Sequence, residues 1–186
     1  MARHAPAAIG VEIGALTPAE YAAAIPDLAT LLVDAVEGGA SVNFLAGVTD
    51  EQARDWWTDR LPKVRDGTIT AFVARGTTDD GAILGSTLLI RSRNQNSPHR
   101  AEIAKVIVHR SARRRGIGRA LMAAAEEAAS REGRWLLILD TEAGTAADAL
   151  YRGLGWQVLG TMPNHAMRSD GVLAPTTYFF KDLRST

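Results

Sequence analysis

The segment from Val108 to Leu121 combines residues that could bind a phosphate group. An apolar run ends, a basic loop follows, and Gly116 and Gly118 open a helical pattern. Glycine lets the backbone approach a ligand closely and adopt a positive φ. The first turn of a helix leaves backbone N–H groups without partners, and the helix dipole there favours negative charge. The segment therefore predicts a site suited to a pyrophosphate, with added positive charge from Arg113, Arg114, Arg115 and Arg119.

The same residues exclude two other phosphate loops. A Walker A loop continues with Lys and Ser or Thr, where this chain has Arg119 and Ala120. A dinucleotide-binding loop needs a third glycine where Leu121 stands. A nucleic-acid site is not favoured, because no aromatic residues alternate with the arginines and the formal net charge is zero. The remaining alternative is a solvated basic helix start beside a tight turn.

A strand-helix-strand unit must position this loop. Residues 101–108 are predicted to form a strand, and a helix runs from Gly116 to Gly133. The apolar run 135–139 is typical of a central strand covered on both faces. Two such strands should run parallel with a right-handed crossover. Ligands bind at the carboxyl ends of strands in such sheets, here near Val108 and Asp140.

The flanking elements follow from changes in hydrophobic period. A short helix should open at Thr145 and end near Gly155, and helices are also expected from Thr17 to Gly38 and from Thr49 to Gly67. Pro26 should cause a kink or divide the first of these into two helices. Strands are predicted at 8–13, 68–74, 82–90, 156–159 and 176–181, with a turn at 77–81 and polar loops at 91–99 and 161–172. Residues 1–186 fit one domain, with 1–7 a loose terminus.

Composition excludes several classes of protein. A hydrophobic content of 46% with 23% charged residues argues against disorder. The absence of cysteine excludes disulfides, thiolate metal sites and an acyl-cysteine intermediate. The four histidines lack metal-ligand spacing, so no metal is expected. No signal peptide and no run of about 18 apolar residues occurs, so neither membrane insertion nor export is predicted and the cytoplasm is the default.

Two motifs resemble those of a known family. Arg113-x-x-Gly116-x-Gly118 is similar to the loop with which GNAT N-acetyltransferases bind the pyrophosphate of acetyl-CoA, and Tyr151-Arg152-Gly153-Leu154-Gly155-Trp156 resembles their Tyr-x-x-x-Gly-Phe segment. The resemblance covers residues 100–160 well. Within the family, Asp140-Thr141-Glu142 and the segment 162–171 look most like the tabtoxin-resistance branch. The resemblance implies the GNAT fold: a central mixed, mostly antiparallel sheet with one parallel pair, strands 4 and 5, and flanking helices.

Acetyl-CoA is the co-substrate that the resemblance implies. The family usually has Asn seven residues before the tyrosine, where this chain has Gly144, so only a backbone contact could persist there. An oxyanion donor is expected from a backbone N–H near residues 106–108. The expected cofactor-binding residues are Val106, Ile107, Val108, Arg113, Arg114, Arg115, Gly116, Ile117, Gly118, Arg119, Gly144 and Tyr151.

Glu102 is the candidate general base, because several GNAT enzymes place a catalytic glutamate six residues before the position of Val108. On an ideal strand Glu102 shares a face with Ala104, Val106 and Val108, where a carboxylate is unusual unless it borders a cleft. The alternative is an ordinary carboxylate paired with Arg100.

Two further residues have candidate roles beside Glu102. Asp140 could share a water with Glu102 or hold the ammonium of the acceptor, or it could cap the following loop. Tyr151 matches the tyrosine that the family places near the coenzyme A sulfur, where it would act as general acid. Its alternative is a core aromatic whose hydroxyl is hydrogen-bonded.

The expected reaction is direct acetyl transfer to the primary amine of a small molecule, amino-acid-like or an antimetabolite. Loop 91–99, with Arg91 and Arg93, is expected to supply donors for a carboxylate or carbonyl. Trp56 and Trp57 are expected in the core and the wall of the acceptor cleft. Acetylation of a protein or peptide N-terminus and a non-catalytic acyl-CoA-binding module remain alternatives. The family is compatible with a homodimer.

Overall fold

The computed structural model describes residues 10–77 and 81–185. The predicted loose terminus, the start of the first predicted strand and most of the turn at 77–81 lie outside these residues. The elements in chain order are β1 (Val11–Ala15), α1 (Pro18–Glu37), α2 (Asp50–Thr58), α3 (Leu61–Arg65), β2 (Ile69–Gly76), β3 (Ile83–Arg91), β4 (Arg100–Val108), the 3₁₀ turn η1 (Arg110–Ala112), α4 (Ile117–Arg131), β5 (Leu136–Glu142), α5 (Ala146–Gly153), β6 (Gln157–Met167), β7 (Leu173–Asp182) and the 3₁₀ turn η2 (Leu183–Ser185).

The seven strands form one sheet in the order β1-β2-β3-β4-β5-β7-β6. Strands β4 and β5 run parallel, and every other neighbouring pair of the described strands is antiparallel. The predicted fold class and its parallel pair are confirmed.

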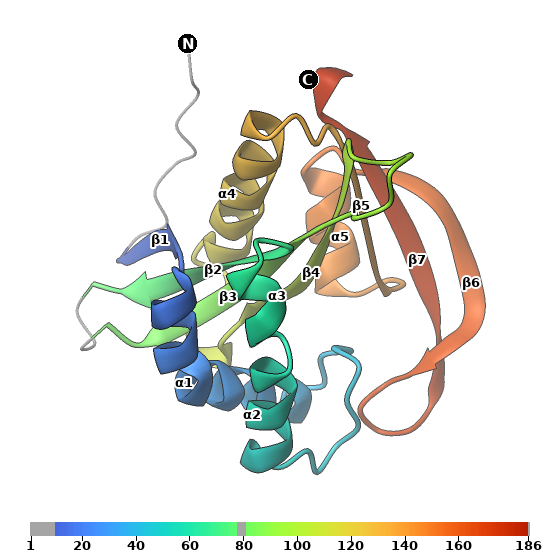
Figure 1. Cartoon of the computed structure of the whole chain (residues 1–186). Coiled ribbons are helices and arrows are strands. Elements are labelled where there is room, and N and C mark those ends of the chain that lie inside the picture. Colours follow the sequence, from blue (N-terminus) through green and yellow to red (C-terminus); the bar gives the residue numbers. More distant parts are fainter. Residues whose placement is uncertain (1–9, 78–80, 186) are drawn as a thin grey trace.

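Helices cover the sheet on both sides (Figure 1). One core cluster joins α4 and α5 to the sheet, and we call this side the α4 face. A second cluster joins α1, α2 and α3 to the other side, the α1 face. On the α1 face, Trp57 is fully buried, and its indole N–H donates to the Leu28 carbonyl at 3.0 Å. The Tyr21 hydroxyl in turn donates to the Trp57 carbonyl at 2.9 Å, so α1 and α2 hold each other in place.

Several boundaries differ from the sequence predictions. The helix from Thr17 is continuous through Pro26, with no division into two helices. The helix predicted from Thr49 to Gly67 is instead two, α2 and α3, because Pro62 lacks the N–H that would continue α2 and begins α3 in its first turn.

The last two strands are much longer than expected. Most of the segment 161–172, predicted as a loop, belongs to β6, which lies at the edge of the sheet and is almost fully exposed. An exposed edge strand has no buried face to produce alternation, and it tolerates breakers such as Gly160 and Pro163. Strand β5 is covered on one face only: Leu137 and Leu139 are buried, but Ile138 is half-buried and Asp140 exposed.

Asp34 of α1 fixes the start of the loop that follows β4. Its carboxylate accepts from the Arg110 backbone N–H at 3.0 Å and from Arg110 Nε at 2.8 Å, and it lies 3.3 Å from His109 Nε2. Burial alone would raise the pKa of Asp34, but the hydrogen bonds from Arg110 outweigh it and lower the pKa overall. His109 thus belongs to the contact between α1 and this loop.

We expect Asp34→Asn to lower the free energy of unfolding by about 1–2 kcal/mol, because it weakens charge-assisted hydrogen bonds to a buried group. Urea denaturation at neutral pH measures this. Since the folded pKa is depressed, the stabilisation should vanish as the pH falls through the Asp34 pKa, below about 3.9. The control is Glu37→Gln, which alters an exposed ion pair to the same arginine and should change stability by less than about 0.5 kcal/mol. Equal effects of the two substitutions would contradict the role of Asp34.

Candidate functional site

The loop after β4 has the geometry of an anion site. Arg114 and Gly116 both have positive φ, 63° and 81°, and Gly116 caps α4. The first hydrogen bond of α4 runs from the Ala120 N–H to the Gly116 carbonyl at 3.0 Å. The N–H groups of the first turn therefore have no acceptor within the helix; they belong to Ile117, Gly118 and Arg119.

The two glycines serve different purposes. A Cβ at Gly116 would meet nothing within 4 Å, so its requirement is the positive φ. A Cβ at Gly118 would lie 3.2 Å from Leu150 Cδ2 and 3.8 Å from Val108 Cγ2, so this glycine lets α4 pack closely against α5 and β4.

The arginines surround this helix start. Arg113, Arg114, Arg115 and Arg119 are all exposed. Arg113 Nε donates to the Val108 carbonyl at 3.3 Å, which directs that side chain back toward the end of β4. The predicted positive surface is therefore present beside the free N–H groups.

A bulge in β4 changes which residues share a face. Ser86 of β3 lies opposite Ile107 and Leu88 lies opposite Ala104, so two residues of β4 stand against one of β3. Lys105, within this bulge, has a φ of 53°, which is uncommon for a residue other than glycine.

The prediction that Glu102 shares a face with Val106 and Val108 is therefore wrong. Glu102 lies on the α1 face with Ala104, whereas Val106 and Val108 pack with the α4-face cluster. The bulge also returns Ile107 to the α1 face, where it is buried.

Strands β4 and β5 pair over three residues and then separate. The paired positions are Arg100 with Leu136, Ala101 with Leu137, and Glu102 with Ile138. Beyond Glu102 the backbone of β4 has no ladder partner on the β5 side. The parallel strands thus separate beyond Glu102, and the separated part of β4 includes residues 106–108, where an oxyanion donor is predicted.

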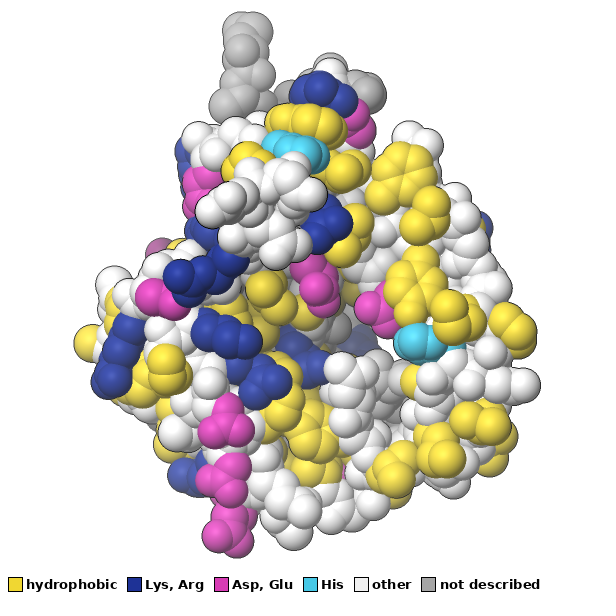
Figure 2. Space-filling view, turned by 45° about the vertical axis from the view of Figure 1, so that its right-hand side comes forward, with side chains coloured by type: hydrophobic (Ala, Val, Ile, Leu, Met, Phe, Trp, Pro, Cys, Tyr) yellow, Lys and Arg dark blue, Asp and Glu magenta, His cyan; other side chains and the backbone are white. Residues whose placement is uncertain are grey.

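Glu102 and Asp140 lie on the same face of adjacent strands. Leu137 and Leu139 point into the α4-face cluster, so Ile138 and Asp140 point to the opposite face, as Glu102 does. Burial, then the charge of Asp140, raises the pKa of Glu102, while Lys105 and Arg100 act in the opposite direction. Charged groups of both signs gather around a hollow between the helices of the α1 face and the β6–β7 hairpin (Figure 2).

Lys105 was missed by the sequence analysis. Its side chain is half-buried, with Nζ 4.7 Å from the centre of the Trp56 ring, and the Arg60 guanidinium lies 3.2 Å from the same ring centre. A lysine inside the apolar run 103–108 was the available signal, since charged residues are rare in such strands. Trp57 is core, as expected, whereas Trp56 is half-buried and lies against Lys105 and Arg60.

Tyr151 lies on the α4 face and is buried. Its ring packs at 5.9 Å from Phe179 and 6.3 Å from Trp156, measured between ring centres. Burial, with a smaller contribution from Asp140, raises the pKa of the Tyr151 hydroxyl, which therefore stays protonated at neutral pH. Among the described residues its hydroxyl makes no hydrogen bond, unlike a structural tyrosine in a core.

Gly144 has fewer backbone groups available to a ligand than expected. Its N–H donates to the Asp148 carboxylate at 2.9 Å, and its φ is 75°. This amide therefore fixes the start of α5, and only the carbonyl oxygen remains for a ligand.

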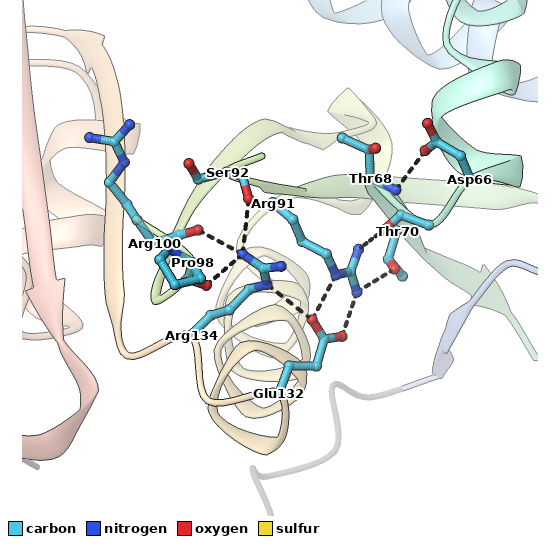
Figure 3. Close-up of polar contacts among 10 residues, drawn as sticks. Asp66, Thr68, Thr70, Arg91, Ser92, Pro98, Arg100, Glu132 and Arg134 are labelled. Carbon is cyan, nitrogen blue, oxygen red and sulfur yellow. Dashed lines mark hydrogen bonds and ion pairs between the residues drawn. The ribbon is translucent and has the colours of Figure 1, made fainter. Parts of the chain in front are cut away.

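Loop 91–99 meets Glu102 at a pocket of about 220 Å³, lined by Ile90, Arg91, Ser92, Arg93, Asn94, Arg100, Ala101, Glu102 and Ile138. Arg91 and Arg93 are not free donors there, contrary to expectation. Arg91 binds Glu132, the Gly67 carbonyl and the Thr70 hydroxyl (Figure 3), and Arg93 binds Asp66 at 2.6 Å.

Arg100 is the cation that this pocket leaves available. Its guanidinium makes no hydrogen bond or ion pair with the described part of the chain. The alternative of a Glu102–Arg100 ion pair is therefore not realised, although Arg100 does lower the pKa of Glu102.

Within residues 10–77 and 81–185, no three His, Cys, Asp or Glu side chains lie close enough to hold a metal ion. None of the helices there has the length and apolar character needed to cross a membrane.

Known proteins resemble this chain in sequence and structure. It resembles the solved structure of a ribosomal-protein-alanine N-acetyltransferase from Brucella melitensis, with 28% identity, a TM-score of 0.71, and coverage of 92% of this chain and 99% of that one. A GCN5-related N-acetyltransferase from Kribbella flavida has 24% identity and a TM-score of 0.72, covering 94% and 98%. A phosphinothricin acetyltransferase from Sinorhizobium meliloti, solved with acetyl-CoA, has 18% identity and a TM-score of 0.76, covering 94% and 89%.

The family assignment rests on a family model that matches more than half of the chain. The model described as the acetyltransferase (GNAT) family matches residues 32–156, which include β4, the loop after it, α4, β5 and α5. These are the elements that form the helix-start anion site and the gap between the parallel strands. The chain belongs to the GNAT family of acetyltransferases.

Proposed function

We propose that this enzyme moves the acetyl group of acetyl-CoA directly to the primary amine of a small polar molecule, amino-acid-like or an antimetabolite. The observation that carries the proposal is the pair of carboxylates, Glu102 and Asp140, on one side of the gap between β4 and β5. The hydroxyl of Tyr151, which is buried and has no hydrogen-bond partner within residues 10–77 and 81–185, lies on the other face of the sheet. The carboxylates can accept a proton, and the tyrosine hydroxyl can donate one.

The start of α4 fits the pyrophosphate of acetyl-CoA. Free N–H groups at Ile117, Gly118 and Arg119 would donate to phosphate oxygens, and the surrounding arginines would screen their charge. A residue with a side chain at Gly116 would carry strain and extend into the space in front of this turn. The bound co-substrate supplies an activated thioester.

Proton transfer is the task assigned to the carboxylates. An alkyl ammonium has a pKa near 10 and must lose a proton before it attacks a carbonyl carbon. Glu102 accepts that proton directly or through a water shared with Asp140. The raised pKa of Glu102 makes it a stronger base than an ordinary carboxylate.

Two further groups would assist the acetyl transfer. A backbone N–H of residues 106–108, beyond the last β4–β5 pair, would donate to the oxygen that gains negative charge. The Tyr151 hydroxyl would give its proton to the departing thiolate, because its raised pKa keeps it protonated.

The resistance or detoxification role within the tabtoxin-resistance branch is the finer part of the proposal. It rests on Asp140-Thr141-Glu142 and on the segment 162–171. Acetylation of a protein N-terminus is the second candidate, favoured by the 28% identity to an enzyme described as acting on a ribosomal-protein alanine.

Gly118→Val should abolish acetyl-CoA binding measured by calorimetry, while circular dichroism shows an unchanged fold. The valine side chain would crowd Leu150 and Val108 and so displace the first turn of α4, whose N–H groups would donate to the phosphates. Gly153→Ala is the matched control, because a Cβ there meets nothing within 4 Å and φ is not positive. If a folded Gly118→Val protein binds acetyl-CoA with unchanged affinity, the assignment of the pyrophosphate to the start of α4 is wrong.

Glu102→Gln should lower kcat about a hundredfold near neutral pH, the loss expected for a general base. Activity should recover partly at high pH, where more of the amine is already deprotonated. In the wild type the acid limb of the pH–rate profile should lie above the usual glutamate range, because the pKa of Glu102 is raised. The exposed Glu51→Gln on α2 serves as control. A variant with the wild-type rate at every pH would make Glu102 structural.

The acceptor class is tested with two panels read by coenzyme A release: amino acids, polyamines and β-lactam-type amines against short peptides. We expect turnover of small amines, because Glu102 and Arg100 border a pocket of only about 220 Å³. Turnover confined to peptides with a free N-terminus would favour the second candidate. Binding of acetyl-CoA without any turnover would favour a non-catalytic module.

A further inference from the structure

The acceptor side of the site contains an amine of its own. Lys105 lies in the bulge of β4, three residues after Glu102, and its backbone is held at a φ of 53°. Its side chain extends over Trp56 on the α1 face, where the carboxylates of Glu102 and Asp140 also lie. The mechanism proposed above does not use this group.

The electrostatic surroundings of Lys105 favour its neutral form. Burial and the nearby Arg60 lower the pKa of Lys105 to about 8, although the charges of Asp140 and Glu102 act against this. Among the described residues, its Nζ makes no hydrogen bond and no ion pair. A substantial fraction of Lys105 is therefore neutral and nucleophilic near pH 8.

The other two lysines of the chain, Lys63 and Lys181, do not combine burial with the absence of a bonding partner. Lys181 is buried, and its Nζ donates to Glu126 at 2.8 Å and to the Leu154 carbonyl at 2.9 Å. Lys63 is exposed on α3. Lys105 differs from both: its amine is half-buried, lies beside a candidate base, and has no hydrogen bond or ion pair with the described residues.

We propose that the enzyme acetylates its own Lys105, within one molecule, when no acceptor occupies the cleft. This inference rests on the proposed function, since the same carboxylates and the same co-substrate are used. Lys105 Nζ, deprotonated to Glu102, forms a bond to the acetyl carbon. The carbon–sulfur bond breaks, and coenzyme A leaves as the thiolate, which takes a proton from Tyr151 or water.

Acetylation would change the cleft in two ways. The product is a neutral amide, so one positive charge beside Arg60 and Trp56 is lost. The added acetyl group also fills space next to Glu102 and Asp140. An enzyme without acceptor would therefore slow its own later turnover.

The test is to incubate the full chain with acetyl-CoA alone and follow the intact mass, with peptide mapping of all three lysines. At pH 7.5 Lys105, with a pKa of about 8, has a neutral fraction on the order of a hundredfold larger than that of the reference lysine side chain. It should therefore be modified far faster than the exposed Lys63, and its rate should level off above pH 8. Diluting the protein should leave the Lys105 rate constant unchanged, and saturating a good acceptor should reduce it.

Variants separate this reaction from chemical acetylation. Lys105→Arg keeps the charge and should remove the fast modification, and Glu102→Gln should slow it at Lys105 but leave Lys63 unchanged. Preincubation with acetyl-CoA should reduce the amine turnover of the wild type and leave that of Lys105→Arg, compared with its own untreated sample, unaffected.

Equal modification of Lys105 and Lys63, or a Lys105 rate that rises with protein concentration, would overturn the inference. If the amine panel is turned over while Lys105 stays unmodified, self-acetylation is wrong and the proposed function stands. If acetyl-CoA supports neither reaction, the proposed function fails first.

Discussion

Strands β4 and β5 pair at three positions, ending at Glu102 and Ile138, and the site depends on their separation beyond that point. Backbone N–H and C=O groups left without a ladder partner destabilise a fold unless water or a ligand satisfies them. The gap must therefore stay accessible or be filled by a bound molecule. The two core clusters, one on each face of the sheet, supply the packing that keeps the strands in place despite these missing bonds.

The bulge in β4 decides which chemistry each side of the gap receives. A regular strand would place Val106 and Val108 beside Glu102 and bury Lys105 in the cluster under α4. With one extra residue, the valines pack toward α4 and α5, while Lys105 joins Glu102 on the α1 face. Charges then collect on the face where we propose that the amine enters, and the other face stays apolar around Tyr151. The strained φ of Lys105 thus lies in the bulge, the part of β4 where the alternation of side chains between the two faces is reversed.

Local signals in the sequence were sufficient for the loop after β4. Gly116 and Gly118 at a strand-to-helix junction predict a helix start open to an anion, whatever the rest of the fold does. The parallel β4–β5 pair also followed, because a strand-helix-strand unit has few arrangements. These signals therefore predicted the helix start and the parallel pair, but not the face of the sheet on which Val106 and Val108 lie.

What could not be predicted depends on long-range contacts. The bulge at Lys105 is a mismatch between β4 and β3 that neither strand shows by itself. Arg91 and Arg93 appeared available because their partners, Glu132 and Asp66, lie 41 and 27 residues away. Strand β6 has no buried face, so its pairing with β7 left no hydrophobic pattern to read.

Helix α1 connects the two halves of the site. Near its middle, the Leu28 carbonyl accepts from Trp57 and so fixes α2, which places Trp56 beside Lys105. Two turns further on, Asp34 holds Arg110 at the start of the loop that leads to Gly116. A displacement of α1 would therefore move Trp56, beside the proposed acceptor site, and the loop before α4 together. Because α1 is one continuous helix through Pro26, both contacts belong to the same rigid element, and the acceptor side cannot rearrange without a strain on the loop that precedes α4.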